Sequence, residues 1–121
     1  MTPLALPYPV SANRYWRTFR NRTVRSAEAS AYRRSVLEAA VAAGVQPVLD
    51  RGVSVSLVLR PKLTKRGEAS KVRLDLDNCI KVALDALIGI AYEDDRQVVK
   101  LTAEIGEPIE GGGLSVRWSV A

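Results

Sequence analysis

Two aspartates and a lysine stand close together in the middle of the chain, where a loop gives way to a helical pattern. Asp75 and Asp77 are two residues apart, so in an extended segment their side chains point the same way. Lys81 follows Asp77 by four residues, which places both on one face of a helix. Mg²⁺ prefers carboxylate, water and phosphate oxygens, and a nearby lysine can offset charge that develops on a phosphate. These residue types predict a Mg²⁺ site for phosphodiester hydrolysis, at which Mn²⁺ is a plausible substitute.

The same residues also have purely structural interpretations. Aspartate is a good helix N-cap, so Asp75 or Asp77 could simply cap the helix that follows. A helical projection sets Asp77 at the border of the apolar stripe, turned partly inward, where a bound cation or Lys81 would offset the cost of burying its charge. Asp85 continues the four-residue spacing and is interpreted as a helical partner of Lys81 rather than as a metal ligand.

A second acidic group, Glu93-Asp94-Asp95, comes just after the same helical pattern. A helix of about 15 residues spans roughly 22 Å, so Asp95 cannot approach Asp75 along the helix itself. The residues after Asp95 would have to run back as a strand for the two groups to meet. Spacing alone does not place Asp95 in the site, and Asp94 and Asp95 could form a solvated turn.

Composition limits the chemistry that the chain can perform. Histidine is absent, which excludes Ser-His and Cys-His nucleophile pairs, and the single cysteine, Cys79, leaves too few ligands for a zinc site. The net charge is +5, and arginine supplies 13 of the 18 basic residues. Arginine suits bidentate contact with phosphate, so the composition favours nucleic acid as the partner over a small-molecule substrate.

The expected location follows from what the sequence lacks. No apolar run approaches the ~18 residues needed to span a bilayer. The first ten residues have neither the basic region nor the long apolar region of a signal peptide. The lone Cys79 cannot form an internal disulfide, which fits a reducing compartment. We therefore expect a cytoplasmic protein without a membrane partner.

Basic residues gather in two segments, one over residues 13–25 and one in a loop over residues 61–73. The first segment holds five arginines and three aromatic residues. Its arginines could contact phosphate or form a solvated face, and we favour phosphate because so many like charges repel without a partner. Its aromatic residues could stack on bases, although for each one a core position is favoured. The residues predicted to bind DNA are Arg14, Arg17, Arg20, Arg22, Arg25, Lys62, Lys65, Arg66, Lys71 and Arg73.

The hydrophobic pattern predicts one domain over residues 1–121 with an α+β fold, in which two helices pack on a small mixed β-sheet in the order β-α-β-α-β-β. Residues 10–26 are expected to form a long ordered loop with a short strand near Thr23–Arg25. Ser26 should cap the first helix and Gly44 should end it, while Gly111–Gly113 should mark a hairpin loop. The expected elements are strands over residues 3–8, 53–60, 98–105 and 114–120 and helices over residues 27–43 and 77–91.

A series of short motifs runs in fixed order across almost the whole chain. The motifs are Leu6-Pro-Tyr-Pro9, Ser11-Ala-Asn-Arg-Tyr15, Ser26-Ala-Glu28 with Tyr32-Arg33, Asp75-Leu-Asp-Asn78, Lys81, Asp85-Ala-Leu87 and Asp94-Asp-Arg-Gln-Val98. Together they resemble the RusA Holliday-junction resolvases, which are endodeoxyribonucleases of bacteria and their prophages. The spaced set from Asp75 to Val98 is far more specific than the Asp-x-Asp pattern alone.

The resemblance implies a homodimer that binds four-way DNA junctions and makes paired, symmetric nicks in a Mg²⁺-dependent reaction of DNA recombination and repair. By position, the essential aspartates of the family fall on Asp75, Asp77 and Asp95, and its essential lysine falls on Lys81. The stretch from Asp85 to the acidic pair is one residue shorter than expected, so Asp94 also stays a candidate ligand. The small α/β domain of the family agrees with the element order above.

Two other functions fit parts of the sequence. A non-catalytic nucleic-acid-binding module would keep the basic surface and leave DNA intact without any need for Mg²⁺. A protein-interaction domain would use the aspartates as helix caps and would show no salt-dependent affinity for DNA.

Overall fold

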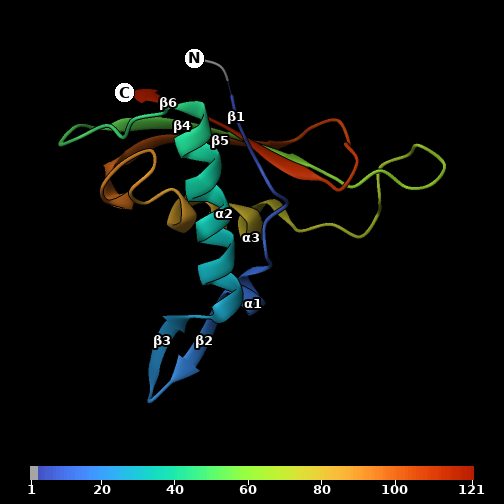
Figure 1. Ribbon diagram of the computed structural model, residues 1–121, viewed down its shortest axis with the longest axis horizontal. Coiled ribbons are helices and arrows are strands. Elements are labelled where there is room, and N and C mark those ends of the chain that lie inside the picture. The colour runs from blue at the N-terminus through green and yellow to red at the C-terminus, as the bar shows by residue number, and fades with distance from the viewer. Residues whose placement is uncertain (1–2) are drawn as a thin grey trace.

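The protein has an α+β fold in which helices pack against one mixed sheet, as the sequence predicts (Figure 1). The computed structural model describes residues 3–121, so the first two residues of the domain expected over residues 1–121 lie outside the described part. In chain order the elements are β1 (Leu4–Leu6), α1 (Ala12–Tyr15), β2 (Trp16–Phe19), β3 (Arg22–Arg25), α2 (Ala27–Ala43), β4 (Val53–Arg60), α3 (Leu76–Ala86), the 3-10 turn η1 (Asp95–Gln97), β5 (Val98–Ile105) and β6 (Gly113–Val120).

Strand β4 is the centre of the main sheet, whose strand order is β1-β6-β4-β5. Its residues alternate between buried and partly exposed positions, which is the pattern that the sequence predicts for a half-buried strand. Strand β5 runs parallel to β4, and β6 runs antiparallel to β4 on its other side. Helix α3 lies in the connection from β4 to β5, because parallel neighbours need a long crossover.

The prediction of a hairpin between the last two strands is wrong. Gly111 and Gly112 do adopt positive φ angles of 76° and 70°, so the glycines do form a tight turn. Strands β5 and β6 nevertheless flank β4 on opposite sides and do not pair with each other. The glycines mark a turn correctly, but local sequence does not state which strand the chain will join after it.

Helix α2 has the predicted bounds. The Ser26 side chain accepts a hydrogen bond from the Ala29 amide at 3.1 Å, and Gly44 ends the helix in the left-handed region at φ 66°. Helix α3 is shorter than predicted, because the chain turns after Leu87 and Gly89 takes φ 85°. Leu87, Ile90 and Ala91 are buried in this turn, which is why their pattern resembles a continued helix.

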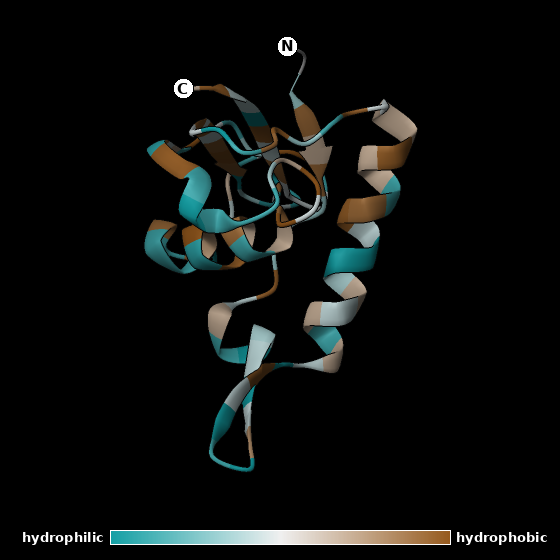
Figure 2. Ribbon diagram, turned by 90° about the vertical axis from the view of Figure 1, so that its left-hand side faces the viewer, coloured by the Kyte–Doolittle hydropathy of each residue, from teal (hydrophilic) through white to brown (hydrophobic). Residues whose placement is uncertain are grey.

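The segment over residues 10–26 differs most from its prediction. In place of a long loop it forms the single turn α1 and the hairpin β2–β3, and the predicted strand near Thr23–Arg25 is part of β3. Arg20 and Asn21 both have positive φ, as a two-residue type I′ turn requires. The hairpin projects from the body of the molecule (Figures 1 and 2). Each of its faces mixes polar and apolar residues, so it lacks the strict apolar alternation that identifies a strand. Within residues 3–121, no helix is both long and apolar enough to cross a membrane.

Candidate active site and nucleic-acid interface

The start of α3 carries the first two predicted ligands. Asp75 occupies the N-cap position and Asp77 lies in the first turn, and both residues are exposed. The Asp75 side chain makes no capping hydrogen bond, so capping alone does not account for this carboxylate. The prediction that Asp77 turns partly inward is wrong, because Cys79, Val82, Ala83 and Ala86 form the buried side of the helix instead.

Lys81 lies one helical turn after Asp77 and is also exposed. Among the described residues, no ion pair within 4.0 Å joins Lys81 to an acid. The interpretation of Asp85 as its partner is wrong, because the Asp85 carboxylate accepts bonds of 2.7 and 2.9 Å from the Arg25 guanidinium and a third from the Tyr15 hydroxyl. The ammonium group of Lys81 is therefore available at the same surface as the two aspartates.

The pKa of Asp85 reflects this pairing. Partial burial raises the pKa of the carboxyl group, but the hydrogen bonds from Arg25 and Tyr15, together with the charges of Arg25 and Arg33, outweigh burial and leave the pKa below its ordinary value. Burial and the Asp85 carboxylate raise the pKa of Tyr15, whose hydroxyl stays protonated. Asp85 thus forms an ion pair that links α3 to the base of the hairpin, and it is not a candidate metal ligand.

Residues near the N-terminus fix the segment that carries Asp75. The Tyr8 hydroxyl accepts a hydrogen bond from the Leu74 amide at 2.8 Å. The Asn78 side-chain oxygen accepts one from the Ala12 amide at 2.6 Å. The spacing of residues in the sequence indicates no role for Tyr8 or Asn78, although both lie within the motifs that resemble the RusA family. They hold the loop and the helix start on either side of Asp75.

The second acidic group lies at a different place. Asp94 caps η1, with its side chain accepting a hydrogen bond from the Arg96 amide at 2.9 Å, and Gln97 completes a capping box. Asp95 is exposed. Because the Asp94 carboxylate is occupied by the cap, Asp95 is the better candidate ligand of the two.

Asp95 lies toward the end of the sheet where β4 begins. The Gln97 side chain donates hydrogen bonds to the Val48 and Arg51 carbonyl groups, just before β4, and β5 starts beside Val53. Asp75 lies toward the other end, because Tyr8, which binds Leu74, also lies 5.5 Å from the Lys62 ammonium group beyond the end of β4. These two ends of the sheet are far apart, because a strand of eight residues such as β4 spans roughly 26 Å.

Within one copy of the chain, Asp75 and Asp77 are therefore separated from Asp95. Strand β5 does run back toward the Asp75 end, as expected, but Asp95 precedes the strand and stays at the far end. Within residues 3–121, no three acidic, cysteine or histidine side chains lie close enough together to hold a metal ion. Asp75, Asp77 and Lys81 share one surface, and Asp95 does not join them within the chain.

The predicted DNA-binding residues divide into those that form an ion pair and those that form none among the described residues. Arg25 is paired with Asp85, and the Arg14 guanidinium lies 2.7 Å from the Glu28 carboxylate. The others are exposed, either on the hairpin or in the loop over residues 61–73: Arg17, Arg20, Arg22, Lys62, Lys65, Arg66, Lys71 and Arg73. The first basic segment begins in α1, which contacts α3, and the second leads directly into α3. The charges of both segments could therefore hold DNA near Asp75.

The aromatic residues of the arginine segment also separate. Tyr15 is fully buried, with 0% of its surface exposed, and Trp16 is half-buried against its ring at a centroid distance of 4.5 Å. The expected core position is thus confirmed for Tyr15. Phe19 is 48% exposed near the hairpin turn, so for this residue it is wrong.

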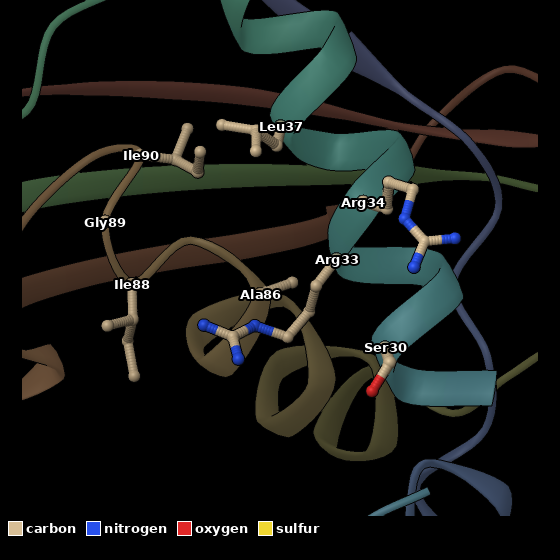
Figure 3. Close-up of a pocket in the computed structure, with 8 residues that line it drawn as sticks. All are labelled: Ser30, Arg33, Arg34, Leu37, Ala86, Ile88, Gly89 and Ile90. Atoms are coloured by element: carbon tan, nitrogen blue, oxygen red, sulfur yellow. The ribbon is translucent and has the colours of Figure 1, made fainter. Parts of the chain in front are cut away.

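A hollow lies between α2 and the turn that follows α3 (Figure 3). The Arg33 side chain extends from α2 toward α3, whereas Arg34 points away from it (Figure 3). Leu37, Ile88 and Ile90 give the hollow an apolar wall. None of the predicted ligands lines it, so it is separate from the candidate active site.

Comparison with known proteins identifies the family. The sequence model described as Endodeoxyribonuclease RusA matches residues 7–117. The chain belongs to the RusA family. Relatives named Crossover junction endodeoxyribonuclease RusA share 37% identity in Escherichia coli K12 and in Enterobacteria phage 82, over 91% of this chain and 86% of each relative. The relative of the same name from Escherichia coli O139:H28 is 34% identical over the same shares of both chains.

The predicted membership of the RusA family is thereby confirmed. The match runs from the segment before α1 into β6, so it includes both acidic groups, Lys81 and the hairpin. RusA-family membership agrees with the surface described above, because a nuclease needs acids that can hold a metal and cations that can hold a phosphate backbone.

Proposed function

We propose that this protein is a metal-dependent endonuclease that resolves four-way DNA junctions by paired, symmetric phosphodiester hydrolysis in recombination and repair. The observation that carries the proposal is the pair of exposed carboxylates, Asp75 and Asp77, beside the exposed Lys81 in a chain of net charge +5. The substrate class is inferred from the relatives, which are named crossover junction endodeoxyribonucleases.

The residues at the start of α3 fit a divalent cation. Mg²⁺ is usually held by one or two carboxylates together with waters and substrate phosphates. Asp75 and Asp77 are exposed, and the Asp75 side chain is not used in capping the helix. We propose that these two carboxylates hold Mg²⁺, or Mn²⁺ in its place. When bound, the cation supplies a water of lowered pKa and stabilises charge on the phosphate.

The chain's own cations have different tasks. Lys81 stands one turn from Asp77, where its ammonium group can stabilise the negative charge that builds up on the reacting phosphate. The exposed arginines that form no ion pair, in the hairpin and in the basic loop over residues 61–73, can hold the DNA backbone on either side. Affinity then comes mainly from the cations, and the aspartates contribute to rate.

A homodimer would complete the site with Asp95. Strand β5 is an edge strand of the sheet, and its free edge can pair with the β5 of a second copy. Antiparallel pairing would bring Asp95 of the second copy to the sheet end where Asp75 lies. Val99, 67% exposed, and Leu101, 37% exposed, give this edge an apolar strip that a second copy would cover.

The charges along β5 support a two-fold axis at Thr102. Lys100 and Glu104 each lie two residues from Thr102 and are exposed on the same side of the strand. Antiparallel pairing about Thr102 therefore places Lys100 of each copy opposite Glu104 of the other, as an isologous interface requires. A Thr102→Cys variant should form an intermolecular disulfide in solution at modest protein concentration. A monomer by sedimentation would contradict the dimer.

The function is tested with a synthetic four-way junction and a linear duplex of the same sequence. Each is incubated with Mg²⁺ or with EDTA, using the natural protein, Asp75→Asn and the matched control Asp50→Asn. We expect symmetric nicking of the junction, none of the duplex, and loss of nicking in EDTA and in Asp75→Asn but not in Asp50→Asn. Cleavage that survives Asp75→Asn would reject the site. Tight binding without cleavage by the natural protein would instead identify a non-catalytic DNA-binding module.

A further inference from the structure

The hairpin β2–β3 is fixed firmly at its base. The Ser26 amide donates to the Tyr15 carbonyl at 2.8 Å and closes the hairpin against α1. Arg25, at the end of β3, makes its two-bond pair with Asp85 on α3. Tyr15 is buried beside the same carboxylate. The base therefore sets the direction in which the hairpin projects from the body (Figures 1 and 2).

The tip of the hairpin carries an exposed aromatic ring among cations. Phe19 is the last residue of β2, pairs with Arg22 across the hairpin, and precedes the tight turn at Arg20 and Asn21. The guanidinium carbons of Arg17 and Arg20 lie 5.3 and 5.2 Å from the centre of the Phe19 ring. Figures 1 and 2 show this tip at the point of the hairpin farthest from the sheet.

Two properties of the hairpin tip, its positive charge and its aromatic ring, are suited to binding DNA. Residues 13–27 contain five arginines and no acidic residue, so the tip concentrates positive charge that repels itself without a polyanion. Arg17, Arg20 and Arg22 can bind phosphates, while the flat Phe19 ring can stack on a base or enter a base step. An exposed ring with guanidinium groups beside it is therefore suited to a place where bases are accessible beside phosphates.

A four-way junction offers such a place. Base pairs at its crossover point lose the continuous stacking of a duplex, so separating them there costs less than in an unbroken helix, where an inserted side chain must first unstack the step. An aromatic residue at the crossover would therefore favour the junction over the duplex. A phosphate contact that the backbone of any duplex can also make does not by itself give this preference.

We infer that Phe19 is a specificity-determining residue that inserts at the crossover point of the junction, while Arg17, Arg20 and Arg22 hold the flanking phosphates. The inference rests on the proposed junction-resolving function and adds the residue that recognises the shape of the substrate. The two-bond pair between Arg25 and Asp85 aims the hairpin from its base. Substitution of Phe19 removes contact with DNA without opening the core, since the ring lies outside it.

The test measures insertion separately from cleavage. A four-way junction with 2-aminopurine at the crossover, and a duplex with the same probe, are titrated in EDTA with the Asp75→Asn protein. Variants in this background are Phe19→Ala, Phe19→Trp and the control Thr18→Ala, which removes an exposed neighbour on the same strand. Circular dichroism checks that each variant is folded.

Binding of the junction should raise the 2-aminopurine fluorescence, because the probe loses stacking. Phe19→Ala should abolish most of this rise and reduce the preference for junction over duplex by about tenfold, in line with the loss of one aromatic stack. Phe19→Trp should retain both effects, and Thr18→Ala should change neither. An undiminished fluorescence rise and preference in Phe19→Ala would overturn the role of Phe19, while junction cleavage by the otherwise natural protein would still support the proposed function. Absence of junction binding by the Asp75→Asn protein would overturn both.

Discussion

The start of α3 and the hairpin β2–β3 carry the two kinds of charge that a nuclease needs, and the protein holds them in opposite ways. Asp75 and Asp77 stand on a helix that packs into the core through Cys79, Val82 and Ala83. The hairpin arginines stand on a two-stranded projection that is fixed at its base. A metal site needs fixed geometry, whereas contacts to a DNA backbone tolerate small adjustments.

The comparison also shows where one chain is insufficient. The hairpin presents Arg17, Arg20 and Arg22 together within a single copy. The acidic surface holds two of the three predicted aspartates, and Asp95 lies toward the other end of the sheet. Recognition could thus be carried by one copy, while we expect the reaction to need two.

The largest effect is expected for the acids. Asp95→Asn should reduce the rate of junction cleavage at least about 1000-fold, because a bound metal lowers the activation barrier by several kcal/mol and each ~1.4 kcal/mol is a factor of ten in rate. Asp94→Asn is the matched control and should retain most of the activity, since its side chain caps η1. Single-turnover cleavage of a labelled junction measures both. Equal loss in the two variants would remove the distinction between the neighbours.

Lys81→Ala should lower the single-turnover rate by roughly 100- to 1000-fold with little change in junction affinity, because we expect the ammonium group to act on charge in the transition state. Arg34→Ala, which removes an exposed arginine of α2, controls for the loss of one positive charge. A Lys81 variant that binds much more weakly but turns over normally would move this residue from the reaction to DNA binding.

Loss of the ion pair between Arg25 and Asp85 at the base of the hairpin should have a smaller effect, mainly on stability. Asp85→Asn should lower the free energy of unfolding by about 1–2 kcal/mol, a charged hydrogen-bond value reduced for partial exposure of Arg25. Because the pKa of Asp85 is lowered in the folded protein, its stabilisation is present above the unfolded pKa of about 3.9 and is lost as the pH falls through the folded value. Urea unfolding at pH 7 and pH 3 should show a difference between the natural protein and Asp85→Asn at pH 7 that narrows at pH 3.

The smallest effect is expected for single hairpin arginines. Replacing Arg17 or Arg22 by Gln should weaken binding to junction and duplex alike and reduce the slope of log affinity against log salt by about 1. Arg14→Gln should change the slope less, because Arg14 is already paired with Glu28. Filter binding between ~50 and ~200 mM salt measures the slopes. An unchanged slope in the Arg17 and Arg22 variants would mean that these arginines are solvated and do not bind phosphates.

Local sequence predicted those features that depend on local physics. The bounds of α2 follow from Ser26 and Gly44, and β4 follows from strict alternation. The hairpin β2–β3 was missed because each of its faces mixes polar and apolar residues. The end of α3 was missed because buried turn residues continue the helical pattern. Neither error could be corrected without tertiary contacts.

The candidate site was predictable in the same uneven way. Asp75, Asp77 and Lys81 come together because they lie within seven residues at one helix start. The pairing of Asp85 with Arg25 spans 60 residues, and the hydrogen bond from Ala12 to Asn78 spans 66, so spacing could not indicate either. The place of Asp95 depends on the order of strands in the sheet and, we propose, on a second copy of the chain.

A mixture of two inactive variants tests the central claim most directly. Asp75→Asn and Asp95→Asn are each expected to be inactive alone, and their subunits are exchanged by mixing before the junction is added with Mg²⁺. If the start of α3 in one copy works with Asp95 of the other, each mixed dimer has one intact site, and the mixture should nick one strand of the junction. If the mixture stays as inactive as its components while mixed dimers are present by native mass spectrometry, the shared site is contradicted.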